Sequence, residues 1–240
     1  MPGGGGDPDG LPRQRRGTTP QMHGRYPDFD VLEESGHWDE VTREVVLARL
    51  DPPALRFFDE AEARTLDAFC DTVLAQDREP RVPVLPFVDA KLFEGRLDGY
   101  RYADMPDDPE TWRLVARGLD QAARERGAPS YGEAGDGPQL AICEAFAETR
   151  LSGGVWEELS VAHAWAVVMR FVLSAFYSHP WAWNEIGFGG PSYPRGYMRL
   201  GIGQKEAWES EDEFPLDPVP DVRDRGLDHP AAEHRDDDAG

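Results

Sequence analysis

Apolar side chains recur every three or four residues in three long stretches of the chain, which is the spacing of one buried face of an α-helix. The second stretch ends at Gly127 and the third ends before Gly153 and Gly154, and glycine is a common helix stop. The pattern predicts three amphipathic helices. Their apolar positions are Leu66, Phe69, Cys70, Val73 and Leu74; Trp112, Val115, Leu119 and Ala122; and Leu140, Cys143, Phe146, Ala147 and Leu151.

A fourth stretch, residues 156–177, is apolar on nearly all sides, which predicts a helix at the centre of a bundle. Shorter helices are expected over residues 39–50 and 86–93. Alternation of polar and apolar residues is scarce. Its best example, residues 81–84, contains a proline that favours an extended linker over a strand.

Helix start signals accompany these stretches. Asp59 and Glu62 have the spacing of a capping box, in which each residue binds a backbone N–H of the other. A carboxylate also precedes a proline at Asp51-Pro52 and at Asp108-Pro109, and proline is favoured at the first helical position. The sequence therefore predicts an all-α fold, an irregular bundle of about five to seven helices.

The composition of the two ends differs from that of the middle. Residues 1–25 are rich in Gly, Pro, Arg and Asp, a composition that predicts a disordered N-terminal arm. Residues 204–240 carry many acidic groups and few apolar ones, and we expect a free or extended acidic tail. The helical domain is expected over residues 26–203.

Charge and hydropathy narrow the classes of partner. The chain has 46 acidic and 25 basic residues and a net charge of -21, which disfavours nucleic acids and anionic lipid surfaces. The most apolar stretch, residues 161–176, contains His163 and Arg170, so we expect no membrane insertion. Arg15-Arg16 is followed by no apolar run, so no export signal is predicted. We expect a cytoplasmic protein, exported only if a partner carries it.

The densest feature is residues 177–197, where aromatic side chains alternate with glycine and proline. This composition predicts a long, rigid loop without regular structure. The loop either folds back on its own core or presents aromatic anchors to a partner, and both possibilities stay open. The same aromatic faces could stack on sugar rings, so a free-standing sugar- or polyol-binding module is an alternative. The candidate partner-binding residues are Trp181, Trp183, Asn184, Tyr193, Arg195 and Tyr197.

No catalytic, cofactor-binding or metal-binding residue is assigned from the sequence. The cysteines, Cys70 and Cys143, fall on apolar helix faces, where a thiol behaves as a small buried group; a disulfide between them stays open. A metal-dependent enzyme built on His37, His163 and His179 is a third hypothesis. A lone histidine on an apolar helix is more often a hydrogen-bonded core residue than a metal ligand.

The segment after the central helix resembles the gluconate 2-dehydrogenase subunit 3 family. The resemblance covers roughly residues 50–200, and its specific part begins at Tyr177. A capped helix containing Leu66 and Leu74 precedes it. The matching motifs are Tyr177-Ser178-His179-Pro180, Asn184-Glu185-Ile186-Gly187 and Gly190-Pro191-Ser192-Tyr193-Pro194-Arg195-Gly196-Tyr197.

This resemblance implies a small helical subunit that accompanies a large flavin-dependent sugar or polyol dehydrogenase of the glucose-methanol-choline type. Such complexes sometimes include a cytochrome subunit. The resemblance places FAD and the catalytic base in the large subunit and implies that this chain supports assembly, stability or export of that flavoprotein. Many members carry a twin-arginine signal, which is not predicted here, so a cytoplasmic complex is the simpler expectation.

Overall fold

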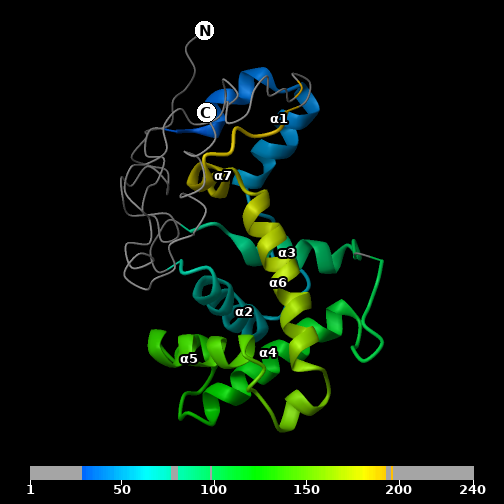
Figure 1. The fold of residues 1–240 in the computed structure, drawn as a ribbon, viewed down its shortest axis with the longest axis vertical. Coiled ribbons are helices and arrows are strands. Elements are labelled where there is room, and N and C mark those ends of the chain that lie inside the picture. The colour runs from blue at the N-terminus through cyan, green and yellow to red at the C-terminus, as the bar shows by residue number, and fades with distance from the viewer. Residues whose placement is uncertain (1–28, 77–80, 98, 193–195, 197–240) are drawn as a thin grey trace, which may run out of the picture.

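The computed structural model describes residues 29–76, 81–97, 99–192 and 196. The predicted arm, residues 1–25, and the predicted tail, residues 204–240, lie outside these residues. The described part of the chain is helical and contains no β-strand, which confirms the predicted all-α class. Figure 1 shows the arrangement. The elements are the 3₁₀-helix η3 (Val31–His37), α1 (Glu40–Leu47), η4 (Ala48–Leu50), α2 (Glu60–Val73), α3 (Val84–Phe93), α4 (Asp108–Arg124), η5 (Tyr131–Glu133), α5 (Asp136–Ala147), η6 (Gly154–Glu157), α6 (Val161–Ser178) and α7 (Pro180–Ile186).

The helix start signals are confirmed in part. Asp59 caps α2 and forms the predicted capping box with Glu62. Helix α4 begins one residue earlier than expected, because the carboxylate of Asp107 accepts the Glu110 N–H at 2.9 Å. The signal at Asp51-Pro52 starts no helix, since residues 51–58 contain no helical turn.

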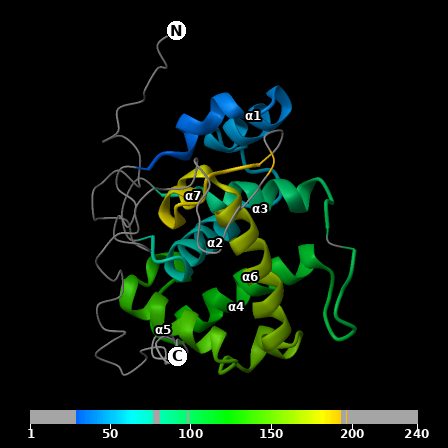
Figure 2. The same ribbon diagram turned by 45° about the horizontal axis from the view of Figure 1, so that its top comes forward.

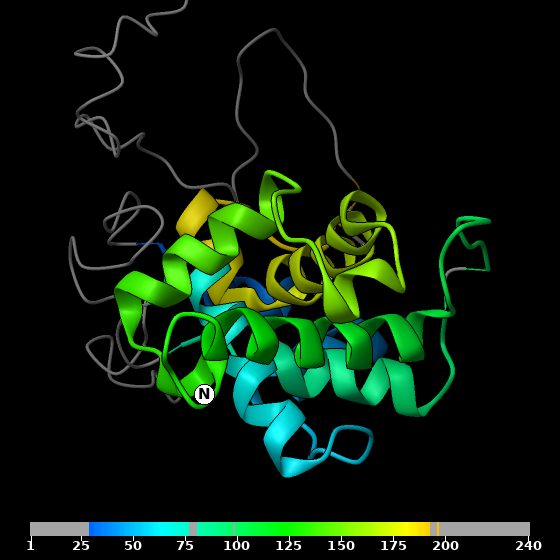
Figure 3. The ribbon, with the colours of Figure 1, turned by 90° about the horizontal axis from the view of Figure 1, so that it is seen from below.

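The main core lies between helices α2 to α6. Helix α2 packs against α3, α4 and α5, and α6 packs against α3, α4 and α5. Seen from below, α4 spans the middle of the molecule (Figure 3). The largest fully buried apolar side chains of this core are Trp112, Tyr131, Phe69, Phe146, Phe171, Leu66, Leu85, Leu119 and Ile142.

A second, smaller core joins the two ends of the described chain. It contains Val31 of η3, Trp38 directly after η3, Val46 near the end of α1, and Trp183 of α7. Helices α1 and α7 lie together at one end of the molecule (Figures 1 and 2). Residues far apart in the sequence therefore close this end of the fold.

Two predictions about the later part of the chain are wrong. Helix α6 does not lie at the centre of the bundle, because it exposes one face, including Leu173 and Tyr177, to solvent. The loop predicted from residue 177 is not irregular throughout, since residues 180–186 form α7. Pro180 occupies the first turn of that helix, where the missing N–H is not needed.

Candidate partner-binding face

Helix α7 carries three of the six predicted partner-binding residues, and two of them point into the protein. Trp183 is 7% exposed and Asn184 is 1% exposed. The Trp183 Nε1–H donates to the Tyr177 carbonyl at 2.6 Å, and the Val31 N–H donates to Asn184 Oδ1 at 2.8 Å. These side chains join α7 to α6 and to η3, and they leave almost no surface for a partner or a sugar ring.

The other predicted anchors divide into one half-buried residue and three outside the described chain. Trp181 packs against the main core, with its ring 4.7 Å from the ring of His179. Tyr193, Arg195 and Tyr197 lie outside the described residues. An anchoring role for these three stays a prediction from the sequence.

His179 forms the junction between α6 and α7. Its Nδ1 accepts the Trp181 N–H at 3.2 Å and so caps α7. Burial lowers the pKa of His179 to about 4. The guanidinium of Arg49 donates to the Ser178 carbonyl. The ring is therefore neutral near pH 7 and has a structural role as a helix cap.

Helix α6 has an exposed apolar face. Ala162, Ala166, Leu173 and Tyr177 are exposed and follow one another at intervals of four and seven residues, so they share one side of the helix. Arg170 is the one Lys, Arg, Asp or Glu of α6, and its guanidinium lies 4.8 Å from the Tyr100 ring and 3.8 Å from Asp108. We call Ala162, Ala166, Leu173 and Tyr177 the α6 face.

A helix with this face can contact either protein or lipid. By length and composition α6 could cross a bilayer, a test that core helices of soluble proteins also pass. Its other side packs against α3, α4 and α5. An apolar surface of this kind, backed by a packed core, is typical of a protein interface.

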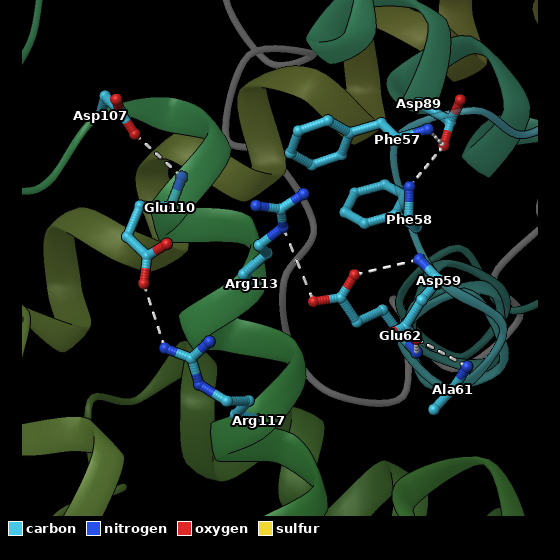
Figure 4. A network of polar contacts seen from close by, with 10 residues as sticks. All are labelled: Phe57, Phe58, Asp59, Ala61, Glu62, Asp89, Asp107, Glu110, Arg113 and Arg117. Atoms are coloured by element: carbon cyan, nitrogen blue, oxygen red, sulfur yellow. Dashed lines mark hydrogen bonds and ion pairs between the residues drawn. The ribbon is translucent and has the colours of Figure 1, made fainter.

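A polar network near α2 and α4 is structural (Figure 4). Asp89 is fully buried on α3, and its carboxylate accepts the backbone N–H groups of Arg56, Phe57 and Phe58 at 2.7 to 2.9 Å. This explains why the chain after Asp51 is not helical: three of its backbone donors bind Asp89 instead of starting a helix.

The same network joins α2 to α4 (Figure 4). Glu62 of the α2 capping box lies 3.8 Å from Arg113, whose guanidinium stands 4.5 Å from the Phe57 ring. Arg117 pairs with Glu110 at 3.1 Å along the exposed side of α4. The Glu62–Arg113 contact therefore links α2 to α4, whereas the Glu110–Arg117 pair lies within α4.

The three histidines of the metal hypothesis bind separate partners. His37 lies 3.7 Å from Glu34, His163 lies 2.9 Å from Asp104, and His179 caps α7. Within the described ranges no group of three or more His, Cys, Asp or Glu side chains could hold a metal ion. The fold does not bring these histidines into one site.

The two cysteines are unpaired and buried in the main core. Burial raises the pKa of both thiols, and that of Cys143 reaches about 11. Neither thiol has the lowered pKa of a nucleophilic cysteine.

Two of the cavities on the described surface lie between helices. The larger, about 610 Å³, lies between α2, η5 and α5, where Asp71 pairs with Arg81 at the rim. The smaller, about 240 Å³, lies between α3 and α6. Neither cavity is lined by any of the six residues predicted from the sequence as partner contacts.

The chain matches one family model, described as gluconate 2-dehydrogenase subunit 3, over residues 60–190. The match begins at the start of α2 and extends beyond the end of α7, so it covers more than half of the chain. Comparisons with curated proteins and with solved structures gave no match.

Proposed function

Because the chain belongs to the gluconate 2-dehydrogenase subunit 3 family, we propose that it is a non-catalytic small subunit that binds a flavin-dependent sugar or polyol dehydrogenase. The family match confirms the resemblance predicted from the sequence. In this proposal the chain supports assembly or stability of the large subunit. That subunit is of the glucose-methanol-choline type and holds FAD and the catalytic base. A cytochrome subunit is an optional further partner, and the complex is cytoplasmic unless a partner carries it out.

We place the docking surface on the α6 face. A subunit of a stable complex needs an apolar patch that a partner can desolvate, and aromatic residues are favoured at the centre of such patches. Tyr177 is 50% exposed and Leu173 is 40% exposed, on a helix held rigidly by packing on its other side. Their exposure is the observation that carries this assignment. Trp183 contributes indirectly, because its hydrogen bond to the Tyr177 carbonyl holds α7 against the end of α6, and Asn184 holds η3 against α7.

The test is co-purification of the tagged full-length chain from its native cells, followed by an absorption spectrum of the eluate. We expect a large oxidoreductase and the yellow absorption bands of a flavin. The double variant Leu173→Glu, Tyr177→Glu should purify without the oxidoreductase and without the flavin bands, because two charges would be desolvated in the interface. The matched control Val41→Glu, Val45→Glu places two charges at exposed apolar positions of α1 and should retain the complex.

The outcomes separate the two parts of the proposal. If the α6 variant keeps the flavoprotein, the docking surface is wrongly placed but the accessory role stands. If the unmodified chain purifies alone and colourless, the accessory role itself is wrong. Calorimetry with a panel of sugars then tests the alternative of a free-standing sugar-binding module. If the isolated chain floats with anionic vesicles, the α6 face binds a membrane surface and not a protein partner.

A further inference from the structure

Three tyrosines form a row along the exposed side of α6. His163, Arg170 and Tyr177 follow one another at intervals of seven residues, so they share one side of the helix. The loop between α3 and α4 supplies two further rings, because Tyr102 stacks on His163 and Tyr100 lies against Arg170. We call Tyr100, Tyr102 and Tyr177 the tyrosine row.

Close contacts with α6 hold the two loop tyrosines in place. The Tyr102 ring is parallel to the His163 imidazole, with an interplanar angle of 2° and centroids 4.0 Å apart. The Arg170 guanidinium lies 4.8 Å from the centroid of the Tyr100 ring and donates to the Tyr100 hydroxyl. Tyr100 is still 57% exposed, so its ring remains accessible to a ligand. The row is a preformed aromatic surface, and a ligand that binds it does not have to order it first.

The spacing of the row suits a polyproline II helix. Proline-rich segments bind grooves lined by aromatic side chains, and their helix advances about 9.3 Å per turn of three residues. Tyr100 and Tyr102 meet edge to face with centroids 6.4 Å apart. Tyr177 stands about 10.5 Å further along α6 than Arg170, which holds Tyr100. Side chains one turn apart on a polyproline II helix can therefore contact both ends of the row.

One segment of the same chain has the sequence pattern of such a ligand. Residues 214–222, which lie outside the described residues, read Phe-Pro-Leu-Asp-Pro-Val-Pro-Asp-Val. The three prolines favour the polyproline II conformation and lower the entropy that is lost on binding. With three residues per turn, Leu216, Val219 and Val222 fall on one edge of that helix. The pattern predicts a ligand with a continuous apolar edge.

The described fold ends near the row, within reach of this segment. Gly190 lies against the small core, since a Cβ there would stand 2.8 Å from the Trp38 ring. Tyr177 belongs to the same end of the fold, near the junction of α6 and α7. The 24 positions from Ser192 to Leu216 span up to about 80 Å when extended. A tether of this kind gives an effective concentration of roughly 1 mM, which is enough to populate a weak contact.

We propose that residues 214–222 dock on the tyrosine row of their own chain as a polyproline II helix, with Leu216, Val219 and Val222 against the tyrosine rings. Residues 1–28 are a poorer ligand, because no two of their prolines are closer than four positions. The proposal concerns the isolated chain and does not rest on the proposed function. Where that function holds, the segment and the flavoprotein compete for Tyr177.

Tyrosine signals in NMR test the proposal on the full-length chain. The chain has seven tyrosines, so ring ¹³C labelling gives few signals, and Tyr→Phe variants assign them. The edge variant Leu216→Ser, Val219→Ser, Val222→Ser removes the apolar edge of the segment. Its matched control removes three apolar side chains from the same tail outside the segment. The control substitutions are Leu227→Ser, Ala231→Ser and Ala232→Ser.

We expect the edge variant, and not its control, to shift the signals of the tyrosine row. Tyr131 is fully buried in the main core and serves as the internal reference. A synthetic peptide of residues 212–224, added to the edge variant, should reverse these shifts saturably. Alanine in place of the three prolines should weaken peptide binding at least about fivefold, because the peptide loses its pre-ordered backbone.

A variant of the row itself provides a second measurement. Tyr100→Ala, made in the edge variant, should weaken peptide binding at least about fivefold, because an exposed aromatic anchor is removed. Leu140→Ala, at an exposed position of α5, is its control and should leave peptide binding unchanged.

Three results would overturn the proposal. The first is a set of row signals that is the same in the unmodified chain and in the edge variant. The second is a peptide that shifts no signal of the row, or that binds equally well with alanine in place of proline. The third is a shift that appears only as the protein concentration rises, which would assign the segment to a second copy of the chain. All three are read on the isolated chain, so they are independent of whether a flavoprotein co-purifies.

Discussion

Val31 and Asn184 are 153 positions apart in the sequence, and the Val31 N–H donates to Asn184 Oδ1 at 2.8 Å in the protein interior. Asn184 Nδ2 also lies 3.4 Å from Oδ1 of Asp30, the residue that caps η3. Trp183, the neighbour of Asn184, packs in the same small core as Val31. One dipeptide of α7 therefore fixes the beginning of the described chain.

We predict that Asn184→Ala destabilises the protein by about 1–3 kcal/mol, because the buried Val31 N–H loses its acceptor. The loss should be local to this end of the fold. Hydrogen exchange of residues 29–38 should accelerate more than that of α2. The control Ile186→Ala, at a 43% exposed position of the same helix, should change the free energy of unfolding by less than about 0.5 kcal/mol. Equal effects of the two variants would contradict this role.

The helices of the main core could be predicted because their apolar spacing is regular. Leu66, Phe69 and Cys70 lie on the buried side of α2, as that spacing requires. Helix α7 could not be predicted in the same way, because its seven residues span too few turns for a period to show. Two residues in the sequence mark its ends. Pro180 occupies the first helical position, and Gly187 follows the last one, where the structure shows a left-handed conformation.

The candidate site was harder to predict than the fold. Aromatic residues are favoured both in cores and at interfaces, so the composition of residues 177–197 did not decide which way Trp183 points. Trp183 is buried because α7 packs against η3, and η3 lies about 150 positions earlier in the sequence. The exposure of Leu173 and Tyr177 could not be predicted from the sequence for a related reason. A helix that is apolar all round does not reveal which side its neighbours leave open.

Asp89 should be the most sensitive carboxylate in the described chain. We predict that Asp89→Asn lowers the free energy of unfolding by about 1–3 kcal/mol, because an amide has one acceptor oxygen for the three N–H groups of residues 56–58. The matched control Glu144→Gln removes the same charge from an exposed position of α5. Chemical denaturation of both variants provides the measurement. A control that loses as much stability as Asp89→Asn would show that net charge, and not the hydrogen bonds, is responsible.

The His179 junction predicts a pH dependence with a definite sign. The folded pKa of about 4 lies below the value of about 6.5 expected in the unfolded chain, so the unfolded chain binds more protons between these two values. The free energy of unfolding should therefore fall as the pH is lowered from 6.5 to 4, by up to about 3 kcal/mol. The variant His179→Asn keeps an acceptor for the cap of α7 but cannot titrate. Its stability should depend less on pH over this window, and an unchanged slope would assign the effect to other groups.

The two buried thiols provide a probe of unfolding. Because burial raises the pKa of Cys143 to about 11 and also raises that of Cys70, almost no thiolate forms at pH 8. We predict that neither cysteine reacts with a disulfide reagent in the folded protein and that both react once denaturant unfolds it. Two equivalents of free thiol in the unfolded, unreduced protein would also agree with the unpaired cysteines of the structure. A result near zero would mean that the two are oxidised.

Two glycines in helices should respond in opposite directions to the same substitution. Alanine is favoured over glycine inside a helix by about 1 kcal/mol. At Gly118 of α4, however, a Cβ would lie 2.6 Å from the ring of Trp156, which packs on Phe146 in the core. Overpacking of this kind costs about 1–3 kcal/mol, so Gly118→Ala should lower the free energy of unfolding by about 1–2 kcal/mol.

At Gly137 of α5 a Cβ would meet nothing within 4 Å, and Gly137→Ala should raise the free energy of unfolding by about 0.5 kcal/mol. Thermal unfolding of the pair measures both effects. Stabilisation by Gly118→Ala would mean that η6 can move away from α4, and that the close contact of Trp156 with α4 is not required by the fold.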